Sequence, residues 1–176
     1  EIEIKRLVPL IKELKILHPE IPISVDTFHH SVAEKVLNIG ANLVNDVSGG
    51  RHDPEIYNVI ADKGSSYVLT HSRGNSKTMD SLAIYSNVVQ DVKNELSNQI
   101  DLALSKGIKE EQIIIDPGIG FAKNVDQNLT LLRNLEEFVS MNYPVLIGAS
   151  RKRFIGSVIN ESDPTKRIFG TAAVAA

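Results

Sequence analysis

The chain has 176 residues, of which 42% are hydrophobic and 23% charged, and its formal net charge is −3. These values are typical of one soluble globular domain, and they exclude a mainly disordered chain, a collagen-like repeat and a coiled coil. The small negative charge does not indicate binding to nucleic acid or to an anionic membrane. No apolar run approaches the ~18 residues that span a bilayer. The absence of cysteine excludes disulfides and thiolate metal sites.

Short β-rich runs alternate with helical patterns along the chain. Apolar residues at helical spacing predict helices over 1–18, 31–39, 53–64, 88–107, 129–139 and 164–176, with Pro9 interrupting the first and Asp53 as the N-cap of the third. Apolar runs predict five strands over 21–25, 41–44, 65–70, 113–115 and 145–148. Such alternation is typical of a parallel sheet covered by helices, an α/β fold. No linker or repeat divides the chain, so we expect a single domain over residues 1–176.

Polar residues follow each predicted strand at the point where it ends. They are Asp26, Asn45, Asp46, the run from His71 to Gly74, Asp116 and the run from Ser150 to Lys152. Ligands of parallel α/β sheets bind at the carboxyl ends of the strands. The convergence of these residues at one edge therefore predicts a ligand site there.

Each of these residues also has a plainer interpretation. Asp26 and Asp116 fit acid–base chemistry, but an aspartate after a strand also caps helices and turns. Asp116 precedes a glycine-rich loop that is neither a P-loop nor a dinucleotide fingerprint. The three cations that follow Ser150 are Arg151, Lys152 and Arg153. They fit either a solvated surface or recognition of an anion or carbonyl. The histidines lack metal-ligand spacing, so no metal ligand is predicted, and among them only His71 directly follows a strand.

Five segments, taken in order, resemble the dihydropteroate synthase family. They are the residues 23–27 (ISVDT), 45–50 (NDVSGG), the loop after His71, 116–123 (DPGIGFAK) and 150–156 (SRKRFIG). The resemblance covers essentially the whole chain and implies a β/α barrel. It implies an enzyme that joins p-aminobenzoate to 7,8-dihydropterin-6-ylmethyl diphosphate, which yields 7,8-dihydropteroate and pyrophosphate in folate synthesis.

The resemblance also implies roles for individual residues. Asp26, Asn45, Asp116 and Lys152 match pterin-pocket positions, Phe121 and Lys123 match positions near the pterin and p-aminobenzoate, and Ser150 and Arg151 border the p-aminobenzoate site, where sulfonamides compete. Asp26 and Lys152 are the expected catalytic residues. Asp26 would stabilise positive charge on the pterin methylene as its C–O bond breaks, and Lys152 would donate to the pterin carbonyl.

Several parts of the family pattern have no counterpart in this sequence. They are the asparagine-rich loop for diphosphate and metal, the Ser-Thr-Arg loop, and the last strand with its Arg-x-His anion site. We therefore expect the Mg²⁺ that assists the family's reaction to bind outside these residues. Five strands instead of eight predict a partial (β/α)8 TIM barrel, truncated at both ends. Homodimerisation, fusion to upstream folate-pathway domains, and a cytoplasmic or mitochondrial location are further expectations that the family implies.

Three other functions are considered beside the synthase. The first is a related pterin-binding methyltransferase domain that passes a methyl group from a folate to a corrinoid, against which the segment from Ser150 to Lys152 argues. The second is a fragment that binds pterin without turnover, because the diphosphate loops are missing. The third is an unrelated phosphate-binding barrel, which leaves Asn45 and the loop after Asp116 unexplained.

Overall fold

A computed structural model describes residues 2–176, and in it four parallel strands alternate with helices. The strands are β1 (Ser24–Asp26), β2 (Leu43–Asp46), β3 (Ser66–Thr70) and β4 (Ile113–Asp116). They form one sheet in the order β1-β2-β3-β4, so each strand pairs with the next one along the chain. The predicted α/β class with parallel strands is confirmed.

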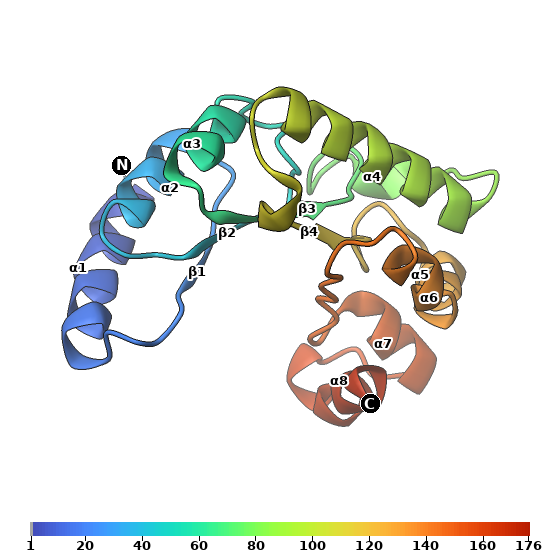
Figure 1. The fold of residues 1–176 in the computed structure, drawn as a ribbon. Helices are drawn as coiled ribbons and strands as arrows, with labels where there is room; N and C mark the ends of the chain where they lie inside the picture. Colours follow the sequence, from blue (N-terminus) through green and yellow to red (C-terminus); the bar gives the residue numbers. More distant parts are fainter. Residues whose placement is uncertain (1) are drawn as a thin grey trace.

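One helix precedes β1, and helices follow each of the four strands. They are α1 (Ile2–Leu17), α2 (His30–Leu37), α3 (Ile56–Lys63), α4 (Val88–Ser105), α5 (Val125–Arg133), α6 (Leu135–Val139), α7 (Arg153–Ile159) and α8 (Ile168–Ala175), with 3₁₀ turns at Met79–Leu82, Glu110–Gln112 and Pro164–Lys166. Figure 1 shows α1 to α4 following one side of the sheet, while no helix of residues 2–176 lies across its opposite side. None of these helices is long and apolar enough to cross a membrane.

The fifth predicted strand, over 145–148, is a single β-bridge in the structure. Val145 pairs with Ile115 in parallel. Two backbone hydrogen bonds hold it, from Ile115 N–H to the Pro144 carbonyl and from the Leu146 N–H to the Ile115 carbonyl, both 2.9 Å. No further bond continues the ladder among the described residues, so the sheet has four strands where five were predicted. The apolar run indicated burial beside β4 but not the length of the pairing.

Several helix boundaries also differ from the sequence-based expectation. Helix α1 continues through Pro9 instead of breaking there. The N-cap position of α3 is Glu55 and the helix begins at Ile56, so Asp53, whose Oδ2 accepts the His30 N–H at 2.9 Å, lies before the cap. The helix predicted over 129–139 divides at Asn134, whose side-chain amide donates to the Thr130 carbonyl at 2.7 Å.

The two faces of the sheet have different surroundings. The side chains of Tyr67, Leu69, Ile113 and Ile115 pack into the main hydrophobic core with the helices, and each is fully buried. Because successive residues of a strand point to opposite faces, their neighbours in sequence point away from these helices. The core thus holds one face of the sheet, and the other face is left for polar strand-end residues.

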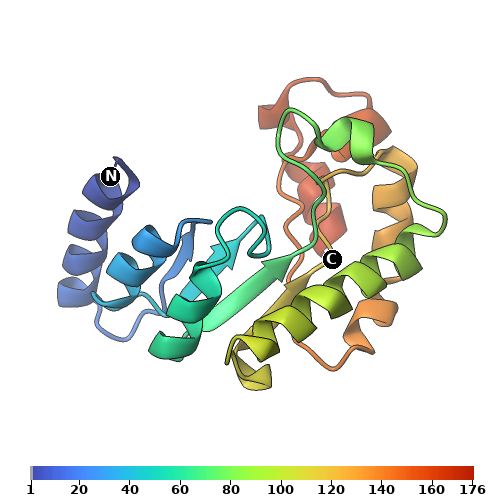
Figure 2. The ribbon, with the colours of Figure 1, turned by 90° about the horizontal axis from the view of Figure 1, so that it is seen from above.

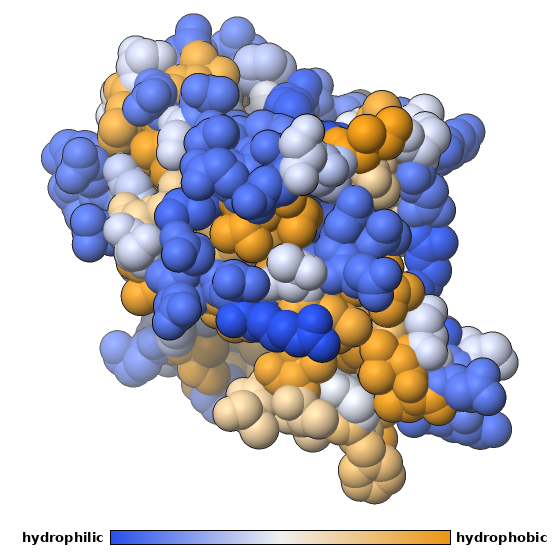
Figure 3. All heavy atoms as spheres, turned by 90° about the vertical axis from the view of Figure 1, so that its right-hand side faces the viewer, coloured by the Kyte–Doolittle hydropathy of each residue, from blue (hydrophilic) through white to orange (hydrophobic). Residues whose placement is uncertain are grey.

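The C-terminal elements bring further residues to the carboxyl end of the strands. Figure 2 shows the loop after β3 lying beside the segment around α7. An ion pair joins the two, from Arg153 Nη2 to Asp80 Oδ1 at 2.6 Å. Helix α7 buries Phe154 and Ile155, while Phe169 of α8 is 86% exposed. Hydrophobic residues gather at the lower part of the face in Figure 3, where α7 and α8 lie.

Candidate functional site

Residues from all four strands meet on the helix-free face of the sheet. Because successive side chains of a strand alternate between faces, four strand residues point to this face. They are Asp26 of β1, Asn45 of β2, Thr70 of β3 and Asp116 of β4. In register, Asp26 pairs with Asn45, and Thr70 pairs with Asp116. The structure therefore brings the predicted pterin-pocket residues Asp26, Asn45 and Asp116 to one edge.

Asp26 and Asn45 form a side-chain pair. The Asn45 Nδ2 donates a hydrogen bond to Asp26 Oδ1, which fixes the orientation of the amide. Asn45 Oδ1 is buried and has no hydrogen-bond partner within residues 2–176. Buried polar atoms usually have partners, so an unpaired carbonyl oxygen on this face points to a ligand that donates to it.

Asp116 is buried at the start of the glycine-rich loop. Its Oδ1 accepts the Gly118 N–H at 2.7 Å, and no donor from residues 2–176 hydrogen-bonds its Oδ2. Burial raises the pKa of the Asp116 carboxyl, while the Gly118 N–H and the cations of Lys152 and Lys123 lower it. Gly118 has φ +71, and a Cβ there would lie 1.8 Å from the His71 carbonyl oxygen. Only glycine therefore allows this loop to pass so close to the end of β3.

Lys152 lies across the loop from Asp116. Its Nζ donates to the Ile119 carbonyl and lies 4.2 Å from the centre of the Phe121 ring. Its methylene stem packs on Gly120, where a Cβ would lie 2.6 Å from Lys152 Cδ. Burial lowers the pKa of Lys152 and the Asp116 carboxylate raises it. The loop thus presents a cation and an aromatic ring beside a buried carboxylate.

The Lys123 side chain points into the protein, and its Nζ forms hydrogen bonds with the backbone of the glycine-rich loop. It is 6% exposed, and its Nζ donates to the carbonyls of Gly118 at 3.0 Å and Phe121 at 2.9 Å. The same Nζ lies 2.9 Å from His71 Nδ1. These three acceptors match the three N–H bonds of an ammonium group, although burial lowers the pKa of Lys123 to about 7. Lys123 therefore positions the loop, and its predicted contact with substrate stays a prediction.

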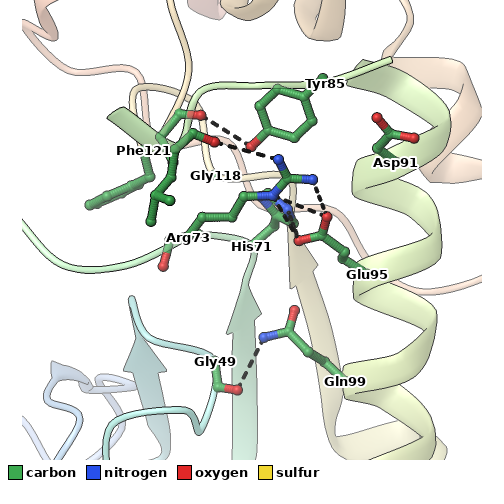
Figure 4. A network of polar contacts seen from close by, with 12 residues as sticks. Gly49, His71, Arg73, Tyr85, Asp91, Glu95, Gln99, Gly118 and Phe121 are labelled. Carbon is green, nitrogen blue, oxygen red and sulfur yellow. Dashed lines mark hydrogen bonds and ion pairs between the residues drawn. The ribbon is translucent and has the colours of Figure 1, made fainter. Parts of the chain in front are cut away.

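His71 links Lys123 to the ion pair between Arg73 and Glu95 of helix α4. Figure 4 shows His71, Arg73 and Glu95 together. His71 Nε2 lies 3.0 Å from Glu95 Oε2, and Arg73 Nε donates to both Glu95 oxygens at 3.1 and 3.2 Å. The Arg73 guanidinium also stacks on Tyr85, 3.9 Å from the ring centre. Burial lowers the pKa of His71 to about 4, so the ring is neutral at pH 7. Its neighbours assign the proton to Nε2, which donates to Glu95, while Nδ1 accepts from Lys123.

The sequence pattern did not reveal Glu95. The residue is in the middle of α4 and follows no strand, so it lies outside the strand-end pattern. One signal was available: Glu95 lies one turn from the buried Val92 and one turn from the buried Gln99. A carboxylate bordering the apolar stripe of a helix indicates a partner on the element beneath it.

Acid is expected to destabilise the fold through His71. The pKa of its imidazole is about 4 when folded and about 6.5 when unfolded, so the unfolded chain binds the proton first as the pH falls. The stability contribution is therefore complete above pH 6.5 and is lost between pH 6.5 and 4. Urea unfolding across this range should show a smaller slope of unfolding free energy against pH in His71→Gln than in the natural chain. Identical slopes would contradict the assignment.

Removing the Glu95 carboxylate is expected to lower the free energy of unfolding by about 2 kcal/mol, because Arg73 and His71 lose their acceptor. This is below the cost for a fully buried pair, since the Glu95 side chain is 35% exposed. Denaturant unfolding of Glu95→Ala measures the change. The matched control is Asp80→Ala, which breaks the exposed pair with Arg153 and should cause no measurable loss. Equal stability of the two variants would overturn the expectation.

Ser150 and Arg151 lie in an exposed turn before α7. Arg151 adopts φ +54, its N–H donates to Thr171 Oγ1 at 2.9 Å, and its carbonyl accepts from Arg167 Nη1 at 3.0 Å. These bonds tie the turn to the end of the chain around α8. The contact of Ser150 and Arg151 with p-aminobenzoate stays a prediction.

A cavity of about 440 Å³ opens among the loops that follow the four strands. Phe28, Arg51, Arg73, Met79 and Phe121 are among the residues that line it. Arg51 Nη2 donates to Ser72 Oγ at 2.6 Å, and no carboxylate of residues 2–176 forms an ion pair with this guanidinium. The loops thus enclose an apolar and positively charged space beside Phe121.

The whole chain matches one protein family. The match to the pterin binding enzymes extends over residues 1–176. The chain belongs to the pterin binding enzyme family. A dihydropteroate synthase of Synechocystis is 44% identical over 171 residues, which are 97% of this chain and 59% of that protein. The folic acid synthesis protein fol1 of Pneumocystis carinii is 43% identical over 98% of this chain and 24% of its own length.

Solved structures of such proteins have the same fold. The dihydropteroate synthase of Thermus thermophilus, in complex with 4-aminobenzoate, superposes with a TM-score of 0.90 at 40% identity. The match covers 99% of this chain and 66% of that structure. A second structure of the same protein contains 6HMPPP. The predicted partial barrel is thereby confirmed, and the chain spans less than two thirds of each of these three relatives.

Proposed function

We propose that this family member acts as a dihydropteroate synthase. The observation that carries the proposal is the set of unpaired acceptors on the helix-free face: Asn45 Oδ1 and Asp116 Oδ2, with Lys152 across the loop. The names of the relatives and the 4-aminobenzoate and 6HMPPP bound to the Thermus protein support it. The reaction would join p-aminobenzoate to the pterin diphosphate and release pyrophosphate.

The proposed pterin contacts follow from the donors and acceptors of each side chain. A pterin edge presents an N–H and an NH₂ group side by side, and a carboxylate such as Asp116 accepts from both in a charge-assisted pair. Asn45 Oδ1 accepts a further N–H, because its Nδ2 is already bonded to Asp26. Lys152 donates to the pterin carbonyl while keeping its contact with Phe121.

Asp26 would act on the charge that develops during the reaction. Breaking the C–O bond to the diphosphate leaves positive charge on the pterin methylene, and a nearby carboxylate stabilises it. The amine of p-aminobenzoate then attacks, so the protein needs no strong nucleophile. We place p-aminobenzoate near Phe121, Ser150 and Arg151, and Lys123 supports this loop from below.

The described residues do not fit a magnesium site. No group of three or more His, Asp or Glu side chains comes together within residues 2–176. Mg²⁺ prefers carboxylates and water in octahedral geometry, which two isolated carboxylates on this face do not provide. We therefore derive no step of the reaction through the metal, and Mg²⁺ stays an expectation from the family.

The test is release of pyrophosphate by the chain at its full natural length. With the pterin diphosphate and p-aminobenzoate together, pyrophosphate should accumulate over many turnovers in equal amount with dihydropteroate. Methyl transfer from a methylfolate to a corrinoid would favour the methyltransferase instead. Pterin binding without any turnover would support the binding-only alternative.

Assembly and location are further parts of the proposal. The Pneumocystis relative is a longer folic acid synthesis protein of which this chain matches 24%, and this supports fusion to another folate-pathway domain. A homodimer, one domain truncated at both ends, and a cytoplasmic or mitochondrial location stay predictions. Gel filtration of the full-length protein tests the first of these.

A further inference from the structure

Thr70 carries a buried hydroxyl without a partner. The residue is 1% exposed at the carboxyl end of β3, and its Oγ1 has no hydrogen-bond partner among residues 2–176. Strand β3 lies between β2, which carries Asn45, and β4, which carries Asp116. Thr70 is the register partner of Asp116 and points to the same face. Thr70 is therefore level with Asp116 on one side, while Asn45 on the other side pairs with Val68, two residues before Thr70 on the same face.

Other buried hydroxyls near this edge do have partners. Tyr67 OH donates to Asp46 Oδ2 at 2.7 Å, Tyr57 OH donates to the Gly49 carbonyl at 2.8 Å, and Ser72 Oγ donates to the Val47 carbonyl at 3.0 Å. A buried hydroxyl that lacks a partner destabilises the fold, so each such group needs an explanation, and at the edge of a ligand site a bound ligand is one. Thr70 thus differs from its surroundings on the one face where a ligand is expected.

We propose that the Thr70 hydroxyl binds the pyrimidinone edge of a pterin, between Asn45 and Asp116. The inference rests on the proposed function and adds a residue to its recognition site. Asp116 and Asn45 Oδ1 only accept hydrogen bonds, and one of the two N–H groups of Asn45 Nδ2 donates to Asp26. The pterin edge also presents a ring nitrogen that accepts. Thr70 is a neutral donor on this face that can pair with it, so it selects heterocycles with an acceptor beside their N–H groups.

The test compares Thr70→Val with Thr70→Ser in the full-length protein. Valine has almost the shape of threonine and removes the unpaired hydroxyl, so Thr70→Val should be at least as stable as the natural chain to urea. Its affinity for pteroic acid, measured by calorimetry, should be about tenfold weaker. Thr70→Ser keeps the hydroxyl and should bind within about threefold of the natural chain. A role in packing alone would lower the stability instead and leave the affinity unchanged.

Ser65 provides the matched control. Its Oγ is also buried and unpaired, but it precedes the other end of β3. Ser65→Ala should therefore leave the affinity for pteroic acid unchanged. Equal affinity of Thr70→Val and the natural chain, or a loss of stability in Thr70→Val, would overturn the role of Thr70 while the proposed function stands. Failure of the natural chain to bind pteroic acid would overturn both.

Discussion

Replacing Asp116 with asparagine is expected to weaken pteroic acid binding by about 10²- to 10³-fold. The carboxylate can accept both the N–H and the NH₂ of the pterin, and each charge-assisted bond contributes about 1.5–3 kcal/mol. An asparagine side chain offers one acceptor and turns an NH₂ group toward the ligand's own donors. Calorimetric titration with pteroic acid measures the loss directly.

The fold should tolerate this substitution. The carbonyl oxygen of the new asparagine side chain would still accept the Gly118 N–H that Asp116 Oδ1 accepts now at 2.7 Å. Burial already raises the pKa of the Asp116 carboxyl, so removal of its charge relieves part of the desolvation cost. The control is Asp163→Asn, because Asp163 Oδ1 accepts the Thr165 N–H in a similar turn outside the site. Equal affinity of Asp116→Asn and the natural chain would contradict the proposed pterin contact.

The convergence of Asp26, Asn45 and Asp116 could be predicted from the sequence. Parallel strands end at the same edge, and the alternation along each strand decides which face a residue reaches. Both facts are local, so the position of a residue relative to its apolar run was sufficient. Most of the helices and the first four strands could be found from their apolar patterns, but α7 (Arg153–Ile159) was not predicted.

The direction of Lys123 could not be predicted in this way. It follows the glycine-rich loop, and nothing in its sequence position indicates that its Nζ turns inward to His71 and two carbonyls. The His71 ring that Lys123 contacts is itself bonded to Glu95, a residue of α4 that no strand-end pattern includes. Contacts between distant elements are set by packing, and a single sequence carries no record of which elements meet.

Thr70 and residues 145–148 each have a structural feature that their sequence pattern does not predict. Thr70 ends an apolar run, and the run predicts burial without showing that the hydroxyl lacks a partner. The segment at 145–148 has the composition of a strand, but only two hydrogen bonds connect it to Ile115. Whether a segment forms a ladder depends on the backbone of its neighbours, which composition does not specify.

Replacing Asp26 with asparagine is expected to lower kcat about 100-fold and to change pterin affinity by less than about threefold. Asp26 already accepts a hydrogen bond from Asn45 Nδ2, and an asparagine oxygen would accept it as well, so the ground-state site keeps its geometry. What is lost is the negative charge opposite the methylene, which matters only while the C–O bond breaks. Single-turnover rates with the pterin diphosphate and p-aminobenzoate measure this step apart from product release.

The matched control for Asp26 is Asp53→Asn, since Asp53 also pairs with a neighbouring side chain, His30, but outside the site. This variant should keep the natural rate. A purely structural role for Asp26 would lower stability and affinity together, whereas a role in charge stabilisation lowers the rate of a complex that still forms. Asp26→Asn should therefore reduce kcat at nearly constant affinity, while Asp116→Asn should reduce affinity first. If both variants lost affinity and rate in equal proportion, the separate roles given to the two carboxylates would be wrong, because both would then be binding the ring alone.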